Sequence, residues 1–255
     1  MRASHTATYA IGDIHGNLAA LDDLLKQVEL ELKGGDTIVF LGDYIDWGAE
    51  SKGCIDRILQ LRSTGPTDVH CLMGNHEEWF LETMSDYTRH SWLLGMGGLT
   101  TIKSYSEVAE DAIRSALNEL GPRILTEPVS LPYSLFFDLI PNSHQAFFDN
   151  LKTYHRDSFA VYSHGGLDPN AGPVESQRIK ALLWGAGNFP REYRGSDLLI
   201  YGHWNNPVFN SSGWPKPRSI NRTVGIDMIR HGVLCAVRLP DMKVFQSSRF
   251  DTSPI

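Results

Sequence analysis

The sequence contains little cysteine, no excess of positive charge and no long apolar stretch. Its 255 residues include three cysteines, Cys54, Cys71 and Cys235, without Cys-x-x-Cys spacing, so we expect reduced core thiols and no disulfide framework. Lys and Arg total 23 against 30 Asp and Glu, and this net charge of −7 argues against a surface that coats nucleic acid. No stretch approaches the roughly 20 apolar residues that cross a bilayer.

The remaining composition is typical of a folded α/β protein. Hydrophobic residues make up 42% of the chain and charged residues 21%, and the length suits one domain over residues 1–255. The first five residues lead almost directly into an apolar stretch and contain no signal-like apolar region. We therefore expect a single cytoplasmic domain with no membrane partner.

Five short motifs each follow an apolar stretch rich in β-branched or aromatic residues. The stretches predict strands at residues 8–11, 38–41, 69–73, 159–162 and 198–201. The motifs are Gly-Asp-Ile-His-Gly (12–16), Gly-Asp-Tyr-Ile-Asp (42–46), Gly-Asn-His-Glu (74–77), Ser-His-Gly-Gly (163–166) and Tyr-Gly-His (201–203). Because loops at the ends of crossover-connected strands collect at one edge of a sheet, we expect the motifs to meet there.

These motifs contain six oxygen and nitrogen donors, enough for two transition-metal ions. The donors are Asp13, His15, Asp43, Asn75, His164 and His203. Their mixed chemistry suits manganese, iron, zinc or cobalt, whereas calcium prefers more oxygen. One carboxylate can serve two cations about 3.5–4 Å apart, and a water shared by two such ions becomes a nucleophile near neutral pH.

The segments between the motifs predict helices and turns. Apolar spacing indicates a helix from Leu18, with Asn17 as its N-cap, another over residues 51–61, and a third that begins at or just after the Gly-Asn-His-Glu motif. Residues 84–150 indicate mixed helix and loop, including an amphipathic helix over 108–120. Turn-forming residues predict a loop at 205–219, and two late strands, 232–239 and 243–247, form a plausible hairpin.

In this order, the five motifs resemble the signature of the phosphoprotein-phosphatase-type metallophosphoesterases, especially their bacterial serine/threonine-phosphatase-like branch. Shorter stretches at 92–105, 182–184 and 221–227 share the resemblance, which runs from about residue 8 to about residue 239. It implies a calcineurin-like metallophosphoesterase fold: an α/β protein with a β-sandwich flanked by helices and a dinuclear metal site in strand-end loops.

The resemblance also implies a role for each motif residue. The first metal would bind Asp13, His15 and His203, and the second would bind Asn75 and His164, with Asp43 bridging both ions. A hydroxide bridging two divalent ions, manganese above all, would attack the phosphorus.

Two motif residues next to these ligands would handle protons. His76 would protonate the leaving group, and Asp46 would hold its other ring nitrogen, as carboxylate–histidine pairs do. The alternative is that Asp46 caps a turn and His76 merely lies near the metals. Glu77 is equally well explained as an acid at a helix start, and we expect Asp227 to be a hydrogen-bonding partner near the site.

Three positions depart from the pattern of the family. Trp47 stands where the second motif has a phosphate-binding Arg, and Ala186 stands where the bacterial branch usually has another. Trp204 replaces a Thr after His203. Since an arginine–phosphate contact contributes about 1.5–3 kcal/mol, losing both without replacement would weaken binding of a phosphomonoester dianion.

Three explanations remain open. Other basic residues can supply the contact, and the candidates are Arg191, Arg194, Lys216, Arg218 and Arg222. Alternatively, the substrate carries less charge at phosphorus, and Trp47 and Trp204 either stack on an aromatic group or pack the pocket wall. The third explanation is a weakly catalytic binding module.

The resulting function is a phosphomonoesterase of the serine/threonine protein phosphatase type, acting on a phosphoprotein or a small phosphoester. The alternative enzyme is a nucleotide phosphohydrolase resembling the diadenosine tetraphosphate hydrolases. A pseudo-phosphatase that binds without turnover is the non-catalytic alternative.

Overall fold

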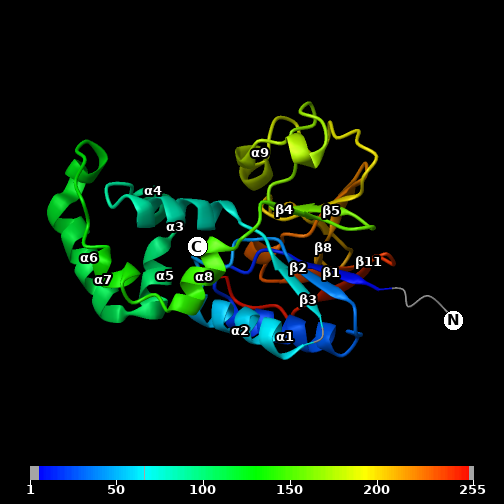
Figure 1. The fold of residues 1–255 in the computed structure, drawn as a ribbon, viewed down its shortest axis with the longest axis horizontal. Helices are drawn as coiled ribbons and strands as arrows, with labels where there is room; N and C mark the ends of the chain where they lie inside the picture. The colour runs from blue at the N-terminus through cyan, green and yellow to red at the C-terminus, as the bar shows by residue number, and fades with distance from the viewer. Residues whose placement is uncertain (1–5, 66, 253–255) are drawn as a thin grey trace.

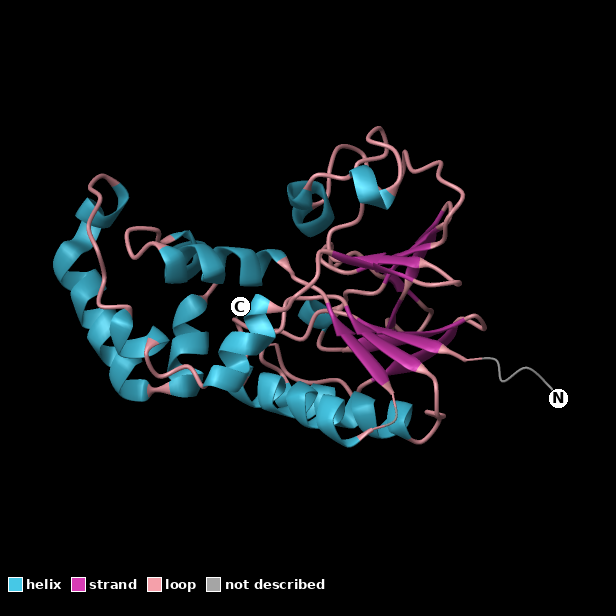
Figure 2. Cartoon of the chain, in the orientation of Figure 1, coloured by secondary structure: helices cyan, strands magenta, loops and turns pink. Residues whose placement is uncertain are grey.

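Two five-stranded sheets, stacked face to face, form the centre of the computed structural model, which describes residues 6–65 and 67–252 (Figures 1 and 2). The first sheet has the order β12-β11-β1-β2-β3, and the second has the order β4-β5-β6-β10-β9. The strands of the first sheet are β1 (Thr8–Ile11), β2 (Thr37–Phe40), β3 (Asp68–Cys71), β11 (Cys235–Leu239) and β12 (Lys243–Gln246). Those of the second are β4 (Tyr154–Arg156), β5 (Val161–Ser163), β6 (Leu199–Tyr201), β9 (Arg218–Ile220) and β10 (Thr223–Gly225).

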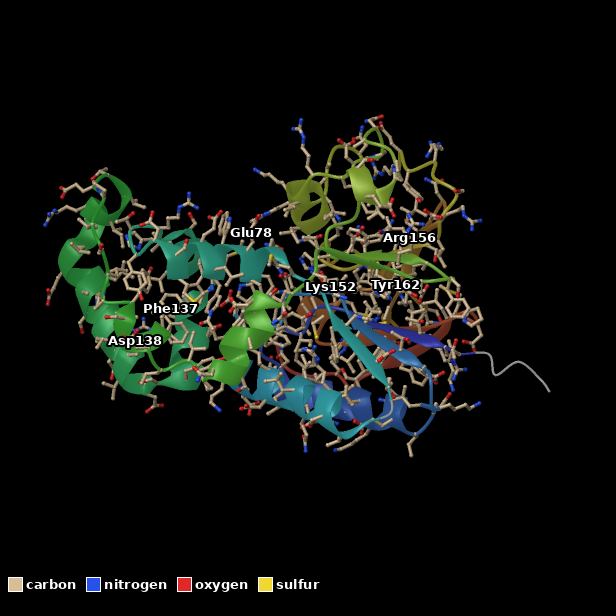
Figure 3. All side chains as sticks on the ribbon, viewed as in Figure 1. Glu78, Phe137, Asp138, Lys152, Arg156 and Tyr162 are labelled. Carbon is tan, nitrogen blue, oxygen red and sulfur yellow. The ribbon has the colours of Figure 1, made fainter. Side chains whose placement is uncertain are left out.

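The inner strands β1 and β2 of the first sheet are covered on both faces, which explains their nearly continuous apolar residues. In β1, Ala10 faces the second sheet and packs in a cluster with Tyr162 and Ile200. Its neighbours Tyr9 and Ile11 point the other way, into the core beneath the helices. Figure 3 shows Tyr162 among the side chains that fill the space between the sheets.

Helices cover the outer face of the first sheet and form a lobe beside the sandwich (Figure 1). The cover consists of α1 (Leu18–Glu29) and α2 (Ser51–Thr64), which contact β12 and β3 respectively. The lobe consists of α3 (Asn75–Ser85), α4 (Ser91–Gly95), α5 (Gly98–Tyr105), α6 (Glu107–Leu120), η1 (Gly121–Leu125), α7 (Ser134–Phe137) and α8 (Asn142–Asp149). One hydrophobic cluster joins the cover and the lobe.

Short helical elements accompany the second sheet. They are η2 (Val174–Ser176), α9 (Ile179–Trp184) and η3 (Ile229–His231). Leu182 of α9 packs with Val161 and Leu199 on the face of the sheet that points away from the sandwich. In the described part of the chain, no helix is both long and apolar enough to cross a membrane.

Strand direction brings the five motifs to one end of the sandwich. β1, β2 and β3 are parallel in register, and β5 and β6 are parallel in the second sheet. Each motif follows the carboxyl end of one of these strands, so the loops converge although they come from two sheets. The predicted β-sandwich flanked by helices, with ligand motifs in strand-end loops, is confirmed.

Most of the predicted elements are present, with small shifts of their ends. The third helix begins at Asn75 itself, inside its motif, and the late strands form an antiparallel pair. Asn17 precedes α1, but its side-chain amide donates to the carbonyls of Ile14 and His15 and does not cap the helix.

The prediction of a loop over residues 205–219 is wrong in part. This segment contains an antiparallel ribbon of β7 (Val208–Phe209) and β8 (Pro215–Lys216), and it reaches into β9 at the edge of the second sheet. Strands of two or three residues among turn formers have no detectable alternation, so the sequence pattern does not reveal them.

Candidate metal centre

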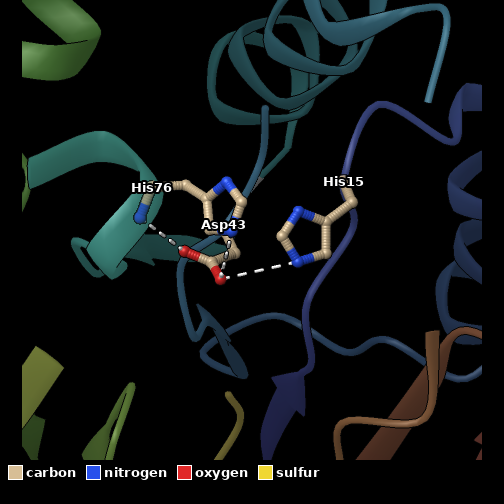
Figure 4. Close-up of side chains that lie close together, drawn as sticks. All are labelled: His15, Asp43 and His76. Carbon is tan, nitrogen blue, oxygen red and sulfur yellow. Dashed lines mark hydrogen bonds and ion pairs between the residues drawn. The ribbon is translucent and has the colours of Figure 1, made fainter. Parts of the chain in front are cut away.

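Asp43 lies at the centre of the converging loops, surrounded by imidazole rings. Its Oδ2 atom is 3.5 Å from Nε2 of His15, 3.3 Å from Nε2 of His164 and 3.9 Å from Nε2 of His76. Figure 4 shows the carboxylate between the rings of His15 and His76. Asp43 is 2% exposed. A carboxylate reached from several sides in this way is suited to bridging two cations.

A second group of donors, from Asn75, His164 and His203, lies beside the carboxylate of Asp43. Oδ1 of Asn75 is 2.9 Å from Nε2 of His164 and 2.9 Å from Nδ1 of His203. The donor atoms of Asp43, His164 and His203 lie within 4.8 Å of one another. The resemblance assigns His203 to the same ion as Asp13 and His15. Its ring lies against Asn75, whereas its backbone N–H donates to the carboxylate of Asp13.

Hydrogen bonds fix the orientation of two of these rings. Nδ1 of His15 is 3.0 Å from the carbonyl of Ile45, and Nδ1 of His164 is 3.0 Å from the carbonyl of Leu41. A ring that donates from Nδ1 presents the lone pair of Nε2, here toward Asp43, which is the form that binds a metal. Burial, reinforced by His76, lowers the pKa of His15 to about 3, so this ring is neutral.

The site also concentrates buried acids. Burial, together with Asp227 and Asp43, raises the pKa of Asp13 well above its ordinary value. Burial likewise raises the pKa of Asp227 to about 6. Within residues 6–65 and 67–252, no Lys or Arg forms an ion pair with Asp13, Asp43 or Asp227. Buried carboxylates without Lys or Arg partners, together with imidazole nitrogens, are a donor set that fits divalent cations.

His76 and Asp46 form a hydrogen-bonded pair beside this centre. Nδ1 of His76 is 2.7 Å from Oδ2 of Asp46. The carboxylate of Asp46 also accepts hydrogen bonds from Nε1 of Trp92 at 3.0 Å and from the hydroxyl of Thr101 at 2.6 Å. Burial lowers the pKa of His76, but Asp43 and Asp46 outweigh burial and raise it above the ordinary value. The pair leaves Nε2 of His76 directed toward Asp43 and the centre.

Glu77 supports the loop that carries Asp43. Its carboxylate accepts hydrogen bonds from the backbone N–H groups of Asp43, Tyr44 and Gly74, at 2.9, 2.8 and 3.0 Å. Burial and the charge of Asp43 raise its pKa to about 7. Glu77 therefore acts as a helix-start acid that also ties the second motif to the third.

The backbone at the site is held in unusual conformations. Positive φ values occur at His15 (46°), Asp43 (52°), Asp46 (72°), Trp47 (64°) and His203 (64°). Such conformations cost about 1–3 kcal/mol each in non-glycine residues, and they cluster at functional sites. The glycines allow close approach to the acids: a Cβ on Gly74 would lie 2.0 Å from Oδ1 of Asp43.

A cavity of about 390 Å³ opens onto the metal-ligand candidates. Besides His15, Asp43, Asn75, His76 and His203, its lining includes Trp47, Trp79, Gly95, Met96, Trp184, Asp227 and Arg230. The rings of Trp79 and Trp184 lie 4.9 Å apart, and Nε1 of Trp184 donates to Glu78, which Figure 3 labels on α3. Trp79 and Trp184 therefore form an aromatic part of the cavity wall.

Of the predicted substrate-binding residues, Trp47 lines this cavity. Trp204 packs instead against Gly185, with its Nε1 donating to the carbonyl of Gly165. Arg194 donates to backbone carbonyls, and Arg218 donates to the carbonyl of Asn206. Neither Arg194 nor Arg218 lines the cavity. The same holds for the exposed residues Arg191, Lys216 and Arg222.

Among the lining residues, Trp79, Trp184 and Arg230 are not predicted from the sequence to contact substrate. Trp184 and Arg230 lie in or next to stretches that resemble the family, and Trp79 follows the Gly-Asn-His-Glu motif by two residues. In the sequence, proximity to these stretches is the signal that indicates a place near the site. The direction of each side chain depends on how α3, α9 and η3 pack around the cavity.

Comparison with known proteins identifies the family of this chain. Residues 7–207 match the calcineurin-like phosphoesterase family. An asymmetrical bis(5'-nucleosyl)-tetraphosphatase of Oceanobacillus iheyensis is 25% identical over 249 residues, 91% of this chain and 88% of that protein. Serine/threonine-protein phosphatase 1 of Salmonella typhimurium is 33% identical over 117 residues, 46% of this chain and 51% of the relative.

Solved structures share the fold. The crystal structure of a candidate diadenosine tetraphosphatase superposes with a TM-score of 0.61 at 18% identity, covering 98% of this chain and 97% of its own. A cold-active protein-tyrosine phosphatase from a Shewanella species superposes with a TM-score of 0.55 at 15% identity, covering 95% and 80%. Members of the family use dinuclear divalent metal centres. The motifs, the sandwich and these matches together show that the chain is a metallophosphoesterase of the calcineurin-like phosphoesterase family.

Proposed function

We propose that this enzyme hydrolyses nucleoside polyphosphates at a dinuclear metal centre. The observation that carries the proposal is the cavity over the metal-ligand candidates, whose walls contain the indoles of Trp79 and Trp184 and a single arginine among the described lining residues. Indole rings bind an aromatic base by stacking, whereas a cluster of arginines would favour a phosphomonoester dianion.

Two ions would be held by two overlapping groups of ligands. Asp13 and His15 would hold one ion, Asn75, His164 and His203 the other, and Asp43 both. When bound, two divalent ions, manganese by preference, supply an activated water and neutralise charge on the phosphoryl oxygens. Burial keeps His15 neutral and therefore free to ligate.

His76 would supply the proton that the leaving oxygen needs. Against the opposing effect of burial, Asp43 and Asp46 raise its pKa above the ordinary value, which favours the protonated ring that a general acid needs. Its Nδ1 hydrogen bond to Asp46 fixes the ring and leaves Nε2 facing the centre, from which it can donate. A positioned general acid of this kind contributes about 10²–10⁴ in rate when the leaving group is basic.

Aromatic walls and the comparisons both support a nucleotide as the substrate. The relative aligned over 91% of this chain is a bis(5'-nucleosyl)-tetraphosphatase. The sequence alone favoured a phosphomonoesterase of the serine/threonine type, which remains the second candidate. Its support is the similarity to the Salmonella protein phosphatase, which covers 46% of the chain.

Rates on matched substrates test the choice. With manganese, we expect kcat/KM for diadenosine tetraphosphate to exceed that for p-nitrophenyl phosphate, its bis-ester and a phosphoserine peptide. Trp184→Ala should lower kcat/KM for the dinucleotide by about 10-fold, the scale of a lost base–aromatic contact, with little effect on methyl phosphate. Trp214→Ala, outside the cavity, is the control. Faster hydrolysis of the phosphopeptide, unaffected by Trp184→Ala, would support the protein-phosphatase alternative.

A further inference from the structure

Arg230 lies in the wall of the metal cavity, on η3, with its side chain against Trp47. The central carbon of its guanidinium is 4.3 Å from the centroid of the Trp47 ring, close enough for a cation–π contact. Trp47 in turn packs against His15 in a tilted arrangement, with ring centroids 4.0 Å apart and an interplanar angle of 32°. Arg230 is therefore linked through Trp47 to a metal-ligand candidate.

The guanidinium of Arg230 has hydrogen-bonding capacity to spare. Arg230 is exposed, and within residues 6–65 and 67–252 its guanidinium makes neither a hydrogen bond nor an ion pair. The nearby Asp227 accepts a hydrogen bond from the backbone N–H of Ile229. A guanidinium has five N–H donors, and stacking on an indole leaves the edge of the fork free. The free donors therefore border the space that a substrate would occupy.

No other arginine or lysine of the described chain is part of this cavity lining. The basic residues expected from the sequence to replace the missing phosphate-binding arginines lie elsewhere, and two of them are engaged with backbone carbonyls.

We propose that Arg230, seated on Trp47, binds the phosphate of the substrate in place of the arginine that the family pattern has at position 47. Trp47 then serves as a platform that orients the guanidinium by its π face, and the free edge of the fork takes two phosphoryl oxygens. This substrate contact rests on the proposed hydrolysis of a phosphate compound, but its affinity for anions can be measured without turnover.

The first test compares Arg230→Ala with a matched control. Arg249 sits over Trp214, with its guanidinium carbon 5.1 Å from the ring, outside the cavity lining. In manganese-loaded protein, Arg230→Ala should weaken binding of inorganic phosphate, measured by calorimetry, by about 10-fold. It should raise KM by a similar factor, while Arg249→Ala changes neither. Arg230→Lys should recover part of the loss, because it keeps the charge and loses the fork.

The second test moves the guanidinium from position 230 to position 47. Trp47→Arg in the wild-type chain should not improve phosphate binding, because it removes the platform and places two guanidinium groups side by side. In an Arg230→Ala background the same change should restore most of the lost affinity, because it returns the family arginine. If Trp47→Arg improves phosphate binding equally in both backgrounds, Arg230 is not the replacement.

The outcomes separate this inference from the proposed function. If Arg230→Ala leaves phosphate affinity and KM within about twofold of the wild type while nucleotides are hydrolysed, the inference fails and the function stands. If no nucleotide is hydrolysed, but phosphate binding falls in Arg230→Ala and returns in the double variant, the inference holds and the nucleotide proposal fails.

Discussion

Oδ2 of Asp46 lies 2.7 Å from Nδ1 of His76, and neither residue has appreciable contact with solvent. Asp46 is itself held by Trp92 and Thr101, which come from α4 and α5 in the helical lobe. The orientation of a residue in the sandwich loops is thus set by helices packed beside it. The helical lobe therefore orients a residue of the site and also forms part of the cavity wall.

This relationship predicts how leaving groups respond to the loss of His76. His76→Asn should reduce kcat by about 10²–10⁴ on a substrate with an alkoxide leaving group, and far less on p-nitrophenyl phosphate, because nitrophenolate leaves without a proton. The measurement is kcat on the two substrates. Equal losses on both would mean that His76 mainly positions the site.

Asp46→Asn should follow His76→Asn in direction with a smaller effect. An amide at this position still accepts a hydrogen bond but no longer carries the charge that raises the pKa of His76. Trp92→Phe, which removes one hydrogen bond to Asp46, should have a smaller effect still. An Asp46→Asn loss that is the same for both leaving groups would contradict the pairing.

Asp43→Asn should reduce the metal content of reconstituted protein from about two ions per chain to one or fewer. The physical reason is that an amide has one oxygen and no charge, so it cannot bridge two cations. Elemental analysis after removal of loose metal gives the count, and Asp68→Asn, an exposed carboxylate on β3, is the control. An unchanged count with unchanged activity would contradict a dinuclear centre.

Glu77→Gln should destabilise the protein even without metal. The carboxylate accepts from several buried N–H groups, and an amide would turn one donor toward them, at about 1–3 kcal/mol for each group left unsatisfied. For a chain of this length we expect Tm in chelator to fall by several degrees. An unchanged Tm with a lower metal affinity would instead make Glu77 a participant in metal binding.

His155 should make the protein less stable in acid. Its ring stacks on His70 at 4.0 Å, and burial together with His70 lowers its pKa to about 4. The unfolded chain therefore binds a proton at higher pH than the folded chain, so this stability is present above about pH 6.5 and is lost as the pH falls. His155 is only half-buried, so we expect a contribution on the order of 1 kcal/mol.

The test is the change in Tm between pH 7 and pH 5. His155→Phe, which keeps a ring for stacking, should lose less Tm over this interval than the wild type, by roughly 2–4 °C. Because other buried histidines also respond to pH, the difference between the two proteins is the informative quantity. Identical losses would show that the stacked pair does not titrate differently in the folded chain.

Much of the fold and the identity of the ligand candidates could be predicted from local pattern. The stretches at 8–11 and 38–41 are fully buried and the other three are partly or fully buried at every position, and their apolar composition predicts strands. Four of the five are followed directly by a glycine, which lets the backbone approach a neighbouring group closely. Gly74 and Asp43 show why, since any side chain at 74 would collide with the carboxylate. The donor residues at a strand end occupy a few consecutive positions, so they can be recognised from the sequence alone.

The grouping of His203 with Asn75 and His164, and the phosphate contact proposed for Arg230, could not be read this way. Each depends on where side chains from segments far apart in the chain meet, such as η3 against the loop after β2. The sequence by itself therefore determined the family, the strand-end donors and the absence of the expected arginines. Only the tertiary structure decided which rings lie together and which arginine faces the cavity, because packing between distant elements sets the direction of a side chain.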